Sequence, residues 1–369
     1  MPALLRTVLR RVGAEDATSI ARLARTVPPS VLCGLPFDHE AQWAARLEAL
    51  EEPRDFALAL FDRSGRALAF AQLHSWAHNE RLKHSATLTQ LIAPPTRSGG
   101  EALARLLDAV LEFAHQGLMA RRLEVLLDEP ARWMSAPLER AGFELEATCR
   151  GRAAVAGVPS TQWRYARIAP AVLPFPAAAQ MAAPQRRRRL ARRFKLTLRP
   201  ATEADAEGLA ALYAAEGAAR GSLQHPRTTA AYWRSQIARI DGQRASLQLV
   251  AEVEQGGGRL IAARGSIMVV SDDPREKHVA TLGIAVRDDW QGQGLGRALM
   301  RELLDHADRW AHWSRVELTV FSDNVAAIAL YESFGFEREG LIRDYALREG
   351  GYAPALQMAR LRGSVPGEV

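Results

Sequence analysis

The spacing of hydrophobic positions changes most clearly between Lys277 and Leu304. The residues from 279 to 286 are mostly apolar or β-branched, which is typical of a buried strand. From 298 to 304 the apolar residues have the spacing of one face of an amphipathic helix. Between the two lies the glycine-rich run from Gln291 to Gly296. The pattern therefore predicts a strand, a tight loop and a helix.

The same periodicities predict alternating strands and helices in both halves of the chain. In the first half the predicted elements are Thr7–Arg11, Asp16–Arg25, His39–Leu50, Phe56–Phe61, Ala67–Trp76, Ser85–Ile92, Glu101–Gln116, Arg122–Leu127, Pro137–Ala141 and Trp163–Ile168. In the second half, besides the central stretch, they are Leu196–Arg199, Ala204–Ala215, Ala230–Ile240, Leu247–Glu254, Leu260–Val270, Arg315–Val320, a helix ending at Gly335, and Ala355–Arg360. This order predicts central sheets with helices on both faces.

The two halves are related to each other. Lys83–Leu88 matches Lys277–Leu282 at an offset of 194, and Arg122–Val125 matches Arg315–Leu318 at an offset of 193. The order of the matches is constant and the offsets are nearly so, which indicates a tandem duplication. We predict one domain over residues 1–168, a linker over 169–193 and a second domain over 194–369.

The linker also explains the charge of the protein. Residues 169–184 are rich in Ala and Pro, and six arginines follow between 186 and 193. Those six account for the whole formal net charge of +6, so the basic character is local and no nucleic acid is expected as a partner. The chain lacks an apolar run long enough to span a membrane, and its two cysteines make no disulfide framework or metal spacing. We expect a cytoplasmic protein without a metal.

The central loop is suited to an anion. Glycines let the backbone turn tightly and approach a ligand, and the N–H groups of a first helical turn favour negative charge. The run lacks the Gly-Lys-Ser/Thr of a Walker loop and the spacing of a Rossmann opening. It resembles instead the Gln/Arg-x-x-Gly-x-Gly/Ala signature of the GNAT superfamily, the acyl-CoA-dependent N-acetyltransferases.

A second motif resembles the same superfamily. The strand from Arg315 leads into Asn324, then Leu330-Tyr331-Glu332, and ends at Gly335-Phe336. The resemblance implies an α/β (α+β) fold with two tandem GNAT-like domains, each a central mixed, mostly antiparallel sheet flanked by helices. Residues 194–362 further resemble bacterial L-amino-acid N-acetyltransferases, through Glu317–Phe321, Asp344–Arg348 and Met358–Arg360.

The resemblance implies acetyl-CoA as co-substrate and roles for particular residues. Tyr331 would protonate the departing coenzyme A thiolate, and Asn324 would either contact the cofactor or cap its helix. The acceptor would meet Leu223, Gln224 and Tyr345. The cofactor would bind along Ile284, Ala285, Val286, Gln291, Gly292, Gln293, Gly294, Leu295, Gly296 and Arg297.

The general base is not identified by the sequence. Relatives often carry a carboxylate at the position of Thr281, and a threonine cannot accept a proton at neutral pH. An α-amine of pKa about 8 is roughly 10% neutral at pH 7, so removing its proton costs about 1.4 kcal/mol of free energy. The same step costs about 4.6 kcal/mol for a lysine-like amine. A site without a strong base therefore favours a weakly basic α-amine.

The first copy lacks these chemical groups. Its loop contains Pro94 and Pro95, which lack N–H donors, and Ala131 and Leu138 stand at the positions of Asn324 and Tyr331. We predict that the first domain is a degenerate, non-catalytic copy.

Three functions stay open at this point. The first is an N-acetyltransferase acting on an amino acid or another small primary amine. The second is a protein N-terminal acetyltransferase. The third is an acyl-CoA-binding regulatory or scaffold protein whose arginine-rich linker contacts an acidic partner. A homodimer is compatible with each.

Overall fold

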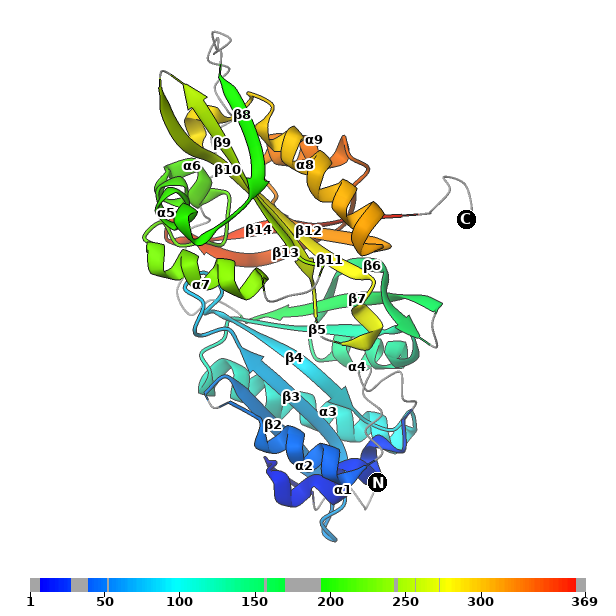
Figure 1. Cartoon of the computed structure of the whole chain (residues 1–369). Coiled ribbons are helices and arrows are strands. Elements are labelled where there is room, and N and C mark those ends of the chain that lie inside the picture. Colours follow the sequence, from blue (N-terminus) through cyan, green and yellow to red (C-terminus); the bar gives the residue numbers. More distant parts are fainter. Residues whose placement is uncertain are drawn as a thin grey trace. The chain divides into compact units, whose positions relative to one another are not determined.

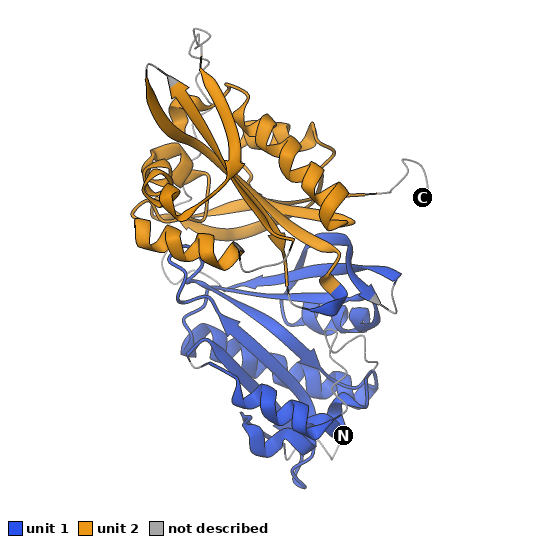
Figure 2. Ribbon diagram, in the orientation of Figure 1, with its two compact units in different colours: residues 1–175, 273–275 blue, residues 176–272, 276–369 orange. Residues whose placement is uncertain are grey.

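The computed structural model divides into two compact units, one of Met1–Phe175 with Asp273–Arg275 and the other of Pro176–Asp272 with Glu276–Val369 (Figure 2). It describes residues 7–27, 39–51, 53–155, 158–169, 194–241, 245–255, 257–271 and 273–362. The predicted linker, except for its first residue, lies outside the described residues, as do Cys33 and the arginine run. Within the described part, no helix is long and apolar enough to cross a membrane.

Unit 1 is a seven-stranded sheet with four helices among its described residues (Figure 1). In chain order its elements are β1 (Val8–Arg11), α1 (Ala17–Ala24), α2 (Glu40–Glu48), β2 (Asp55–Phe61), β3 (Ala67–Ser75), β4 (Ser85–Ile92), α3 (Arg97–Glu112), β5 (Arg122–Asp128), α4 (Ser135–Arg140), β6 (Glu144–Val155) and β7 (Val158–Ile168). The strands lie in the order β1-β2-β3-β4-β5-β7-β6.

Unit 2 repeats this plan and, among the described residues of the two units, has one more short helix. Its elements are β8 (Lys195–Pro200), α5 (Ala206–Ala214), α6 (Glu216–Arg220), α7 (Ala230–Asp241), β9 (Leu247–Gln255), β10 (Gly258–Val269), β11 (Val279–Val286), α8 (Leu295–His306), β12 (Arg315–Phe321), α9 (Val325–Glu332), β13 (Glu337–Arg348) and β14 (Gly351–Leu361). Its strand order is β8-β9-β10-β11-β12-β14-β13, the order of unit 1 shifted by seven strands.

Strand direction is also the same in both units. The pairs β4–β5 and β11–β12 are parallel, and the other described pairs within each unit are antiparallel. The predicted fold, a mixed and mostly antiparallel sheet with flanking helices in each half, is confirmed.

A buried ion cluster is duplicated as well. Arg122 at the start of β5 contacts Glu124 and Glu146, with its shortest N–O distance 2.6 Å to Glu146. Arg315 at the start of β12 makes the same contacts with Glu317 and Glu339, the latter also at 2.6 Å. Burial by itself raises the pKa of Glu124, but the guanidinium groups around it outweigh that effect and lower the pKa to about 2. In each unit the cluster joins the fifth strand of the repeat to the sixth.

Two parts of the fold differ from the sequence prediction. Strand β6 was not predicted, because its inward positions include Glu146 and Arg152, which are buried with polar partners and interrupt the hydrophobic alternation. The closing segment is a hairpin, and the predicted strand Ala355–Arg360 is only the second part of β14. Glu349 and Gly350 turn this hairpin with φ values of 51° and 78°.

The core of unit 2 lies on both faces of its sheet. Helices α8 and α9 contribute Leu299, Leu303 and Ile328 to one apolar cluster. Helices α5 and α7 contribute Leu209 and Trp233 to a second cluster, which packs on the face that carries Val250 and Ala285. The strands between these layers are held from both sides, which fixes the position of the central strand β11.

Candidate active site

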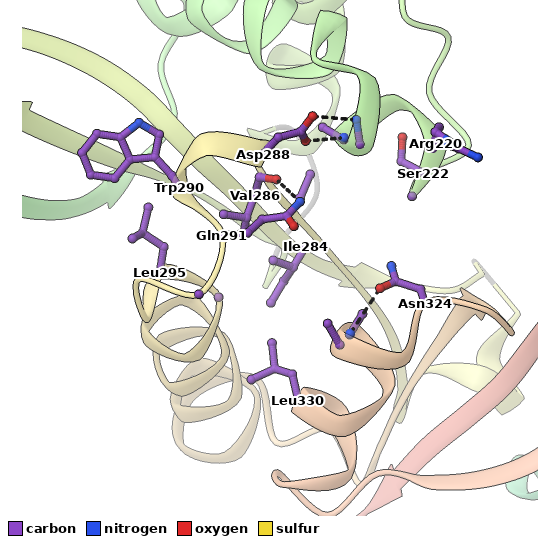
Figure 3. Close-up of a pocket in the computed structure, with 18 of the residues that line it drawn as sticks. Arg220, Ser222, Ile284, Val286, Asp288, Trp290, Gln291, Leu295, Asn324 and Leu330 are labelled. Carbon is purple, nitrogen blue, oxygen red and sulfur yellow. Dashed lines mark hydrogen bonds between the residues drawn. The ribbon is translucent and has the colours of Figure 1, made fainter. Parts of the chain in front are cut away.

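A cavity of about 560 Å³ opens at the end of β11 in unit 2 (Figure 3). Its walls come from α6, the end of β11, the loop before α8 with the first turn of α8, and α9. Of the residues predicted from sequence, it brings together Ile284, Ala285, Val286, Gln291, Gly292, Gly294, Leu295, Gly296, Arg297, Asn324 and Tyr331. Gln293 lies in the same loop but does not line the described wall.

The cavity forms where two parallel strands diverge. The pairing of β11 with β12 ends at Thr281 and Glu317, although β11 continues to Val286 and β12 to Phe321. Beyond this point the edge of β11 that faces β12 has peptide groups that the sheet does not pair. An extended ligand can therefore pair with β11 as an added strand would.

The loop before α8 depends on left-handed backbone at two glycines. Gly292 has φ of 69° and Gly294 has φ of 89°, a region in which side chains other than glycine are strained. Gly294 is also the N-cap of α8 and has no side chain to accept a hydrogen bond from the first helical turn. The N–H groups of that turn therefore remain available to an anion in the cavity.

Two further contacts hold this loop in place. The Nε2 group of Gln291 donates to the carbonyl oxygen of Val286 at 3.2 Å, which ties the loop to the end of β11. A Cβ atom at Gly296 would lie 3.2 Å from Leu330 of α9, so the small residue lets α8 and α9 approach each other. The loop is thus a fixed cradle between a strand end and two helices.

Helix α6 closes one side of the cavity and was not predicted from sequence. The carboxylate of Asp288 accepts from the backbone N–H groups of Gly217 and Ala218 at 2.8 and 3.1 Å (Figure 3). A Cβ atom at Gly217 would come within 2.5 Å of the Asp288 carboxylate, so a larger residue there would displace that carboxylate. A five-residue helix has too few positions to show a periodicity, and its stabilising carboxylate is 71 residues away in sequence.

Tyr331 lies in the cavity wall and is 6% exposed. Its hydroxyl makes no hydrogen bond to another residue that the structure describes. Burial, and next the neighbouring phenol of Tyr213, raise the pKa of Tyr331 to about 12. The group is therefore protonated at neutral pH and can donate to a ligand.

Asn324 caps the helix that carries Tyr331. Its Oδ1 atom accepts from the N–H of Ala327 at 3.2 Å, so of the two roles left open for it, capping is the one seen. Its side chain also lines the cavity (Figure 3).

The predicted acceptor residues are not part of the described cavity wall. Gln224 accepts from the hydroxyl of Tyr232 at 2.8 Å, and Tyr345 makes an edge contact with Phe321. A role for these two residues and Leu223 stays a prediction.

The corresponding helix start in unit 1 has a side-chain cap. Helix α3 begins after Thr96, whose Oγ1 atom accepts from the N–H of Gly99 at 3.1 Å. The threonine side chain thus occupies a donor that Gly294 leaves available in unit 2. A cavity of about 580 Å³ lies beside this helix start, lined by Arg97, Trp133 and Arg140 among others. Ala131 and Leu138 are buried in the apolar core of the unit.

Comparison with known proteins gives matches to N-acetyltransferases. The model of the Acetyltransferase (GNAT) family matches residues 211–336, which lie in unit 2. The L-amino acid N-acetyltransferase AaaT of Escherichia coli K12 is 36% identical over 169 residues, 46% of this chain and 99% of that protein. The N-alpha-acetyltransferase RimI of Mycobacterium tuberculosis is 42% identical over 109 residues, 30% of this chain and 64% of that protein. Among solved structures, ribosomal-protein-alanine N-acetyltransferase from Brucella melitensis matches at 25% identity with a TM-score of 0.40, over 45% of this chain and 99% of that one.

We expect the Gly294→Val variant to lose measurable binding of acetyl-CoA, because valine is strained at φ of 89° and removes the open helix start. Gly257→Val is the matched control, since Gly257 has φ of 81°, has open space around it and lies in the β9–β10 hairpin. Isothermal titration calorimetry with acetyl-CoA, alongside thermal melting, measures both effects. Unchanged affinity in a folded Gly294→Val protein would remove the loop from the cofactor site.

Proposed function

This chain belongs to the GNAT family of acyl-CoA-dependent N-acetyltransferases, and we propose that unit 2 acetylates the α-amine of a free amino acid. The observation that carries the proposal is one cavity that joins an open helix start with a protonated tyrosine. Because the chain belongs to a family of N-acetyltransferases, an enzyme is favoured over an acyl-CoA-binding regulatory or scaffold protein.

The cavity fits the donor, acetyl-CoA, which supplies the thioester that the amine attacks. The N–H groups at the start of α8, from Leu295 onward, would hold the pyrophosphate. The unpaired edge of β11 at Ile284–Val286 would hold the pantetheine arm by backbone hydrogen bonds. A backbone N–H of the same strand would polarise the carbonyl oxygen at which negative charge develops.

Tyr331 is the group suited to protonate the leaving thiolate. A thiol of pKa about 8.5 is a stronger acid than a phenol of pKa near 12, so full transfer from Tyr331 to sulfur is unfavourable unless the tyrosine oxygen is stabilised. A hydrogen bond from the phenol to the sulfur stabilises the developing thiolate without full transfer at the start. The proton then moves to the sulfur as the C–S bond breaks.

The acceptor class follows from the lack of a strong base at the expected position. Thr281 stands where relatives often carry a carboxylate, and it is half-buried at the point where β11 and β12 separate. A weakly basic α-amine loses its proton to water at a cost of about 1.4 kcal/mol at pH 7. The near full-length match to an L-amino acid N-acetyltransferase supports the same class.

A second candidate shares this chemistry. Relatives named as ribosomal protein bS18-alanine N-acetyltransferases are 44% identical over 81 residues, although these cover only 54% of those proteins. A peptide N-terminus also presents a weakly basic α-amine. The two candidates differ in whether the α-carboxylate of the acceptor is free.

An acceptor panel tests the function. We expect acetyl-CoA-dependent thiol release with free L-amino acids, and release at least about tenfold slower with the same amino acids as C-terminal amides or peptides. The measurement is kcat/KM for each acceptor by free-thiol assay, with polyamines and lysine side-chain analogues in the same series. A preference for peptides over free amino acids would select the second candidate, and a preference for polyamines would contradict both.

We expect Tyr331→Phe to lower kcat by about 10²- to 10⁴-fold, the range of general-acid catalysis, with little change in the affinity for acetyl-CoA. Phenylalanine keeps the buried ring and removes only the hydroxyl. Tyr165→Phe, a buried tyrosine of unit 1, is the control and should retain full turnover. Unimpaired turnover in Tyr331→Phe would mean that solvent protonates the thiolate.

We propose that unit 1 is non-catalytic, because Thr96 caps its helix start and Leu138 stands at the position of Tyr331. We therefore expect one acetyl-CoA per full-length chain in a calorimetric titration, and none after Gly294→Val. A stoichiometry of two, or ligand protection of Ser98–Gly100 in hydrogen exchange, would show that the cavity of unit 1 still takes the cofactor.

A further inference from the structure

Arg220 is the last residue of helix α6, and it lines the cavity of unit 2. Its guanidinium is held from one side by Glu349, with N–O distances of 2.8 Å from Nε and 2.9 Å from Nη2. Glu216 approaches Nη1 only to 3.8 Å, and its side chain is 82% exposed. Arginine carries five N–H donors in a planar fork, so one guanidinium can bind more than one carboxylate. The edge between the two Nη atoms is not taken up by Glu349 and can receive a second carboxylate.

The other charged groups of the cavity wall are explained without an acceptor. Among the residues that the structure describes, these groups belong to Glu216, Asp288, Arg297 and Asp323. Asp288 accepts from the start of α6, and Asp323 forms an ion pair with Arg348. Arg297 lies in the first turn of α8, beside the proposed place of the pyrophosphate. Arg220 is therefore the cation of the described wall that lies outside the proposed cofactor cradle.

The position of Arg220 is distinct from the helix start that would hold the pyrophosphate. Figure 3 shows Arg220 across the pocket from Leu295, the first residue of α8. A Cβ atom at Gly221 would lie 3.6 Å from Nδ2 of Asn324, so the end of α6 meets the start of α9. Tyr331 lies on the same helix about two turns, or 10 Å, further on. A ligand that reacts beside Tyr331 can therefore extend toward Arg220.

Glu349 stands at a place where the turn itself does not favour a glutamate. It has φ of 51°, in the left-handed region that glycine adopts more easily than residues with a side chain. Its ion pair with Arg220 adds little net stability, because the two side chains are 37% and 21% exposed. Neither the turn nor the stability of the fold accounts for the carboxylate, which favours a role in orienting the Arg220 guanidinium.

A neighbouring ion pair fixes the hairpin that carries Glu349. Arg348, whose side chain is 3% exposed, contacts Asp323 in the loop before α9. Its guanidinium carbon also lies 4.7 Å from the ring centre of Phe321 at the end of β12. The turn between β13 and β14 is thus tied both to α6 and to the loop before α9. A carboxylate on this turn can hold Arg220 in one orientation.

We propose that Arg220 binds the α-carboxylate of the acceptor amino acid through its open Nη edge, and that Glu349 positions the guanidinium for this contact. The inference rests on the function proposed above, in which the acceptor is a free amino acid. An arginine–carboxylate pair is strong and, when bidentate, also sets the orientation of the bound group. Because the α-amine is one carbon away from the carboxylate, this contact directs the amine toward the acetyl carbon. A C-terminal amide or a peptide bond carries no charge and cannot form the pair.

A cycle that changes both the full-length enzyme and the acceptor tests this contact. Arg220→Met keeps most of the length of the side chain and removes its charge and its donors. It should lower kcat/KM for a free L-amino acid by about 10- to 100-fold, the range of a hydrogen bond to a charged group, and mainly through KM. The value for the corresponding C-terminal amide should hardly change, so the preference of the wild type for the free acid disappears. Calorimetry should show unchanged affinity for acetyl-CoA.

Further variants separate recognition of the carboxylate from a loss of structure. Arg220→Lys keeps the charge without the planar fork and should retain part of the preference, and it completes the test if Arg220→Met does not fold. Arg297→Met should weaken acetyl-CoA binding and leave the ratio of free acid to amide unchanged. Arg239→Met removes an exposed arginine of α7 that donates to Gln236, and it should alter neither quantity.

Glu349→Gln tests the positioning role. It should raise KM for the free amino acid severalfold and leave the amide unaffected. A lower KM would mean that Glu349 competes with the acceptor for Arg220, which would overturn that role.

The outcomes also separate this inference from the proposed function. An equal loss for free acid and amide in Arg220→Met, or weaker acetyl-CoA binding with the preference retained, would overturn the contact between Arg220 and the acceptor. If the wild type shows no preference for free amino acids over their amides, the proposed function fails by itself, before any variant is compared.

Discussion

The separation of β11 from β12 after Thr281 and Glu317 is the feature on which the site of unit 2 depends. Up to that pair the strands are joined by sheet hydrogen bonds, and beyond it one edge of β11 is not paired with β12. The buried contacts of Arg315 with Glu317 and Glu339 tie the start of β12, where it pairs with β11, to β13. The paired and the unpaired parts of β11 therefore belong to one continuous strand, and the cavity lies at its unpaired end.

The two units differ in a few atoms at the helix start where the proposed site of unit 2 lies. Both units keep the strand order, the parallel central pair and the buried arginine with two glutamates. At the helix start one unit has Gly294 and the other has Thr96, whose side chain accepts the hydrogen bond that an anion would otherwise accept. The sheet and its buried ion cluster are common to both units. The proposed ligand site depends in addition on particular residues at the helix start and on the following helix.

Sequence periodicity predicted the strand at Val279–Val286 and the helix after the glycine loop. The prediction for Tyr331 came from the resemblance to the GNAT superfamily, whose motifs are also local in the chain. Helix α6 and its carboxylate Asp288 could not be predicted in this way, since a hydrogen bond between segments 71 residues apart leaves no local pattern. Strand β6 was missed because Glu146 takes an inward position that is apolar in an ordinary strand. In each case the missing information was the partner of a polar group.

The burial of Arg264 is another feature that the sequence does not predict. In the sequence it is one arginine in a strand of mixed polarity, and nothing distinguishes it from a solvent-facing residue. In the structure it is buried beside Trp233, and burial without a carboxylate costs free energy of the order of several kcal/mol unless hydrogen bonds offset it. Because Phe70 stands against the corresponding tryptophan of unit 1, packing alone does not require a cation here.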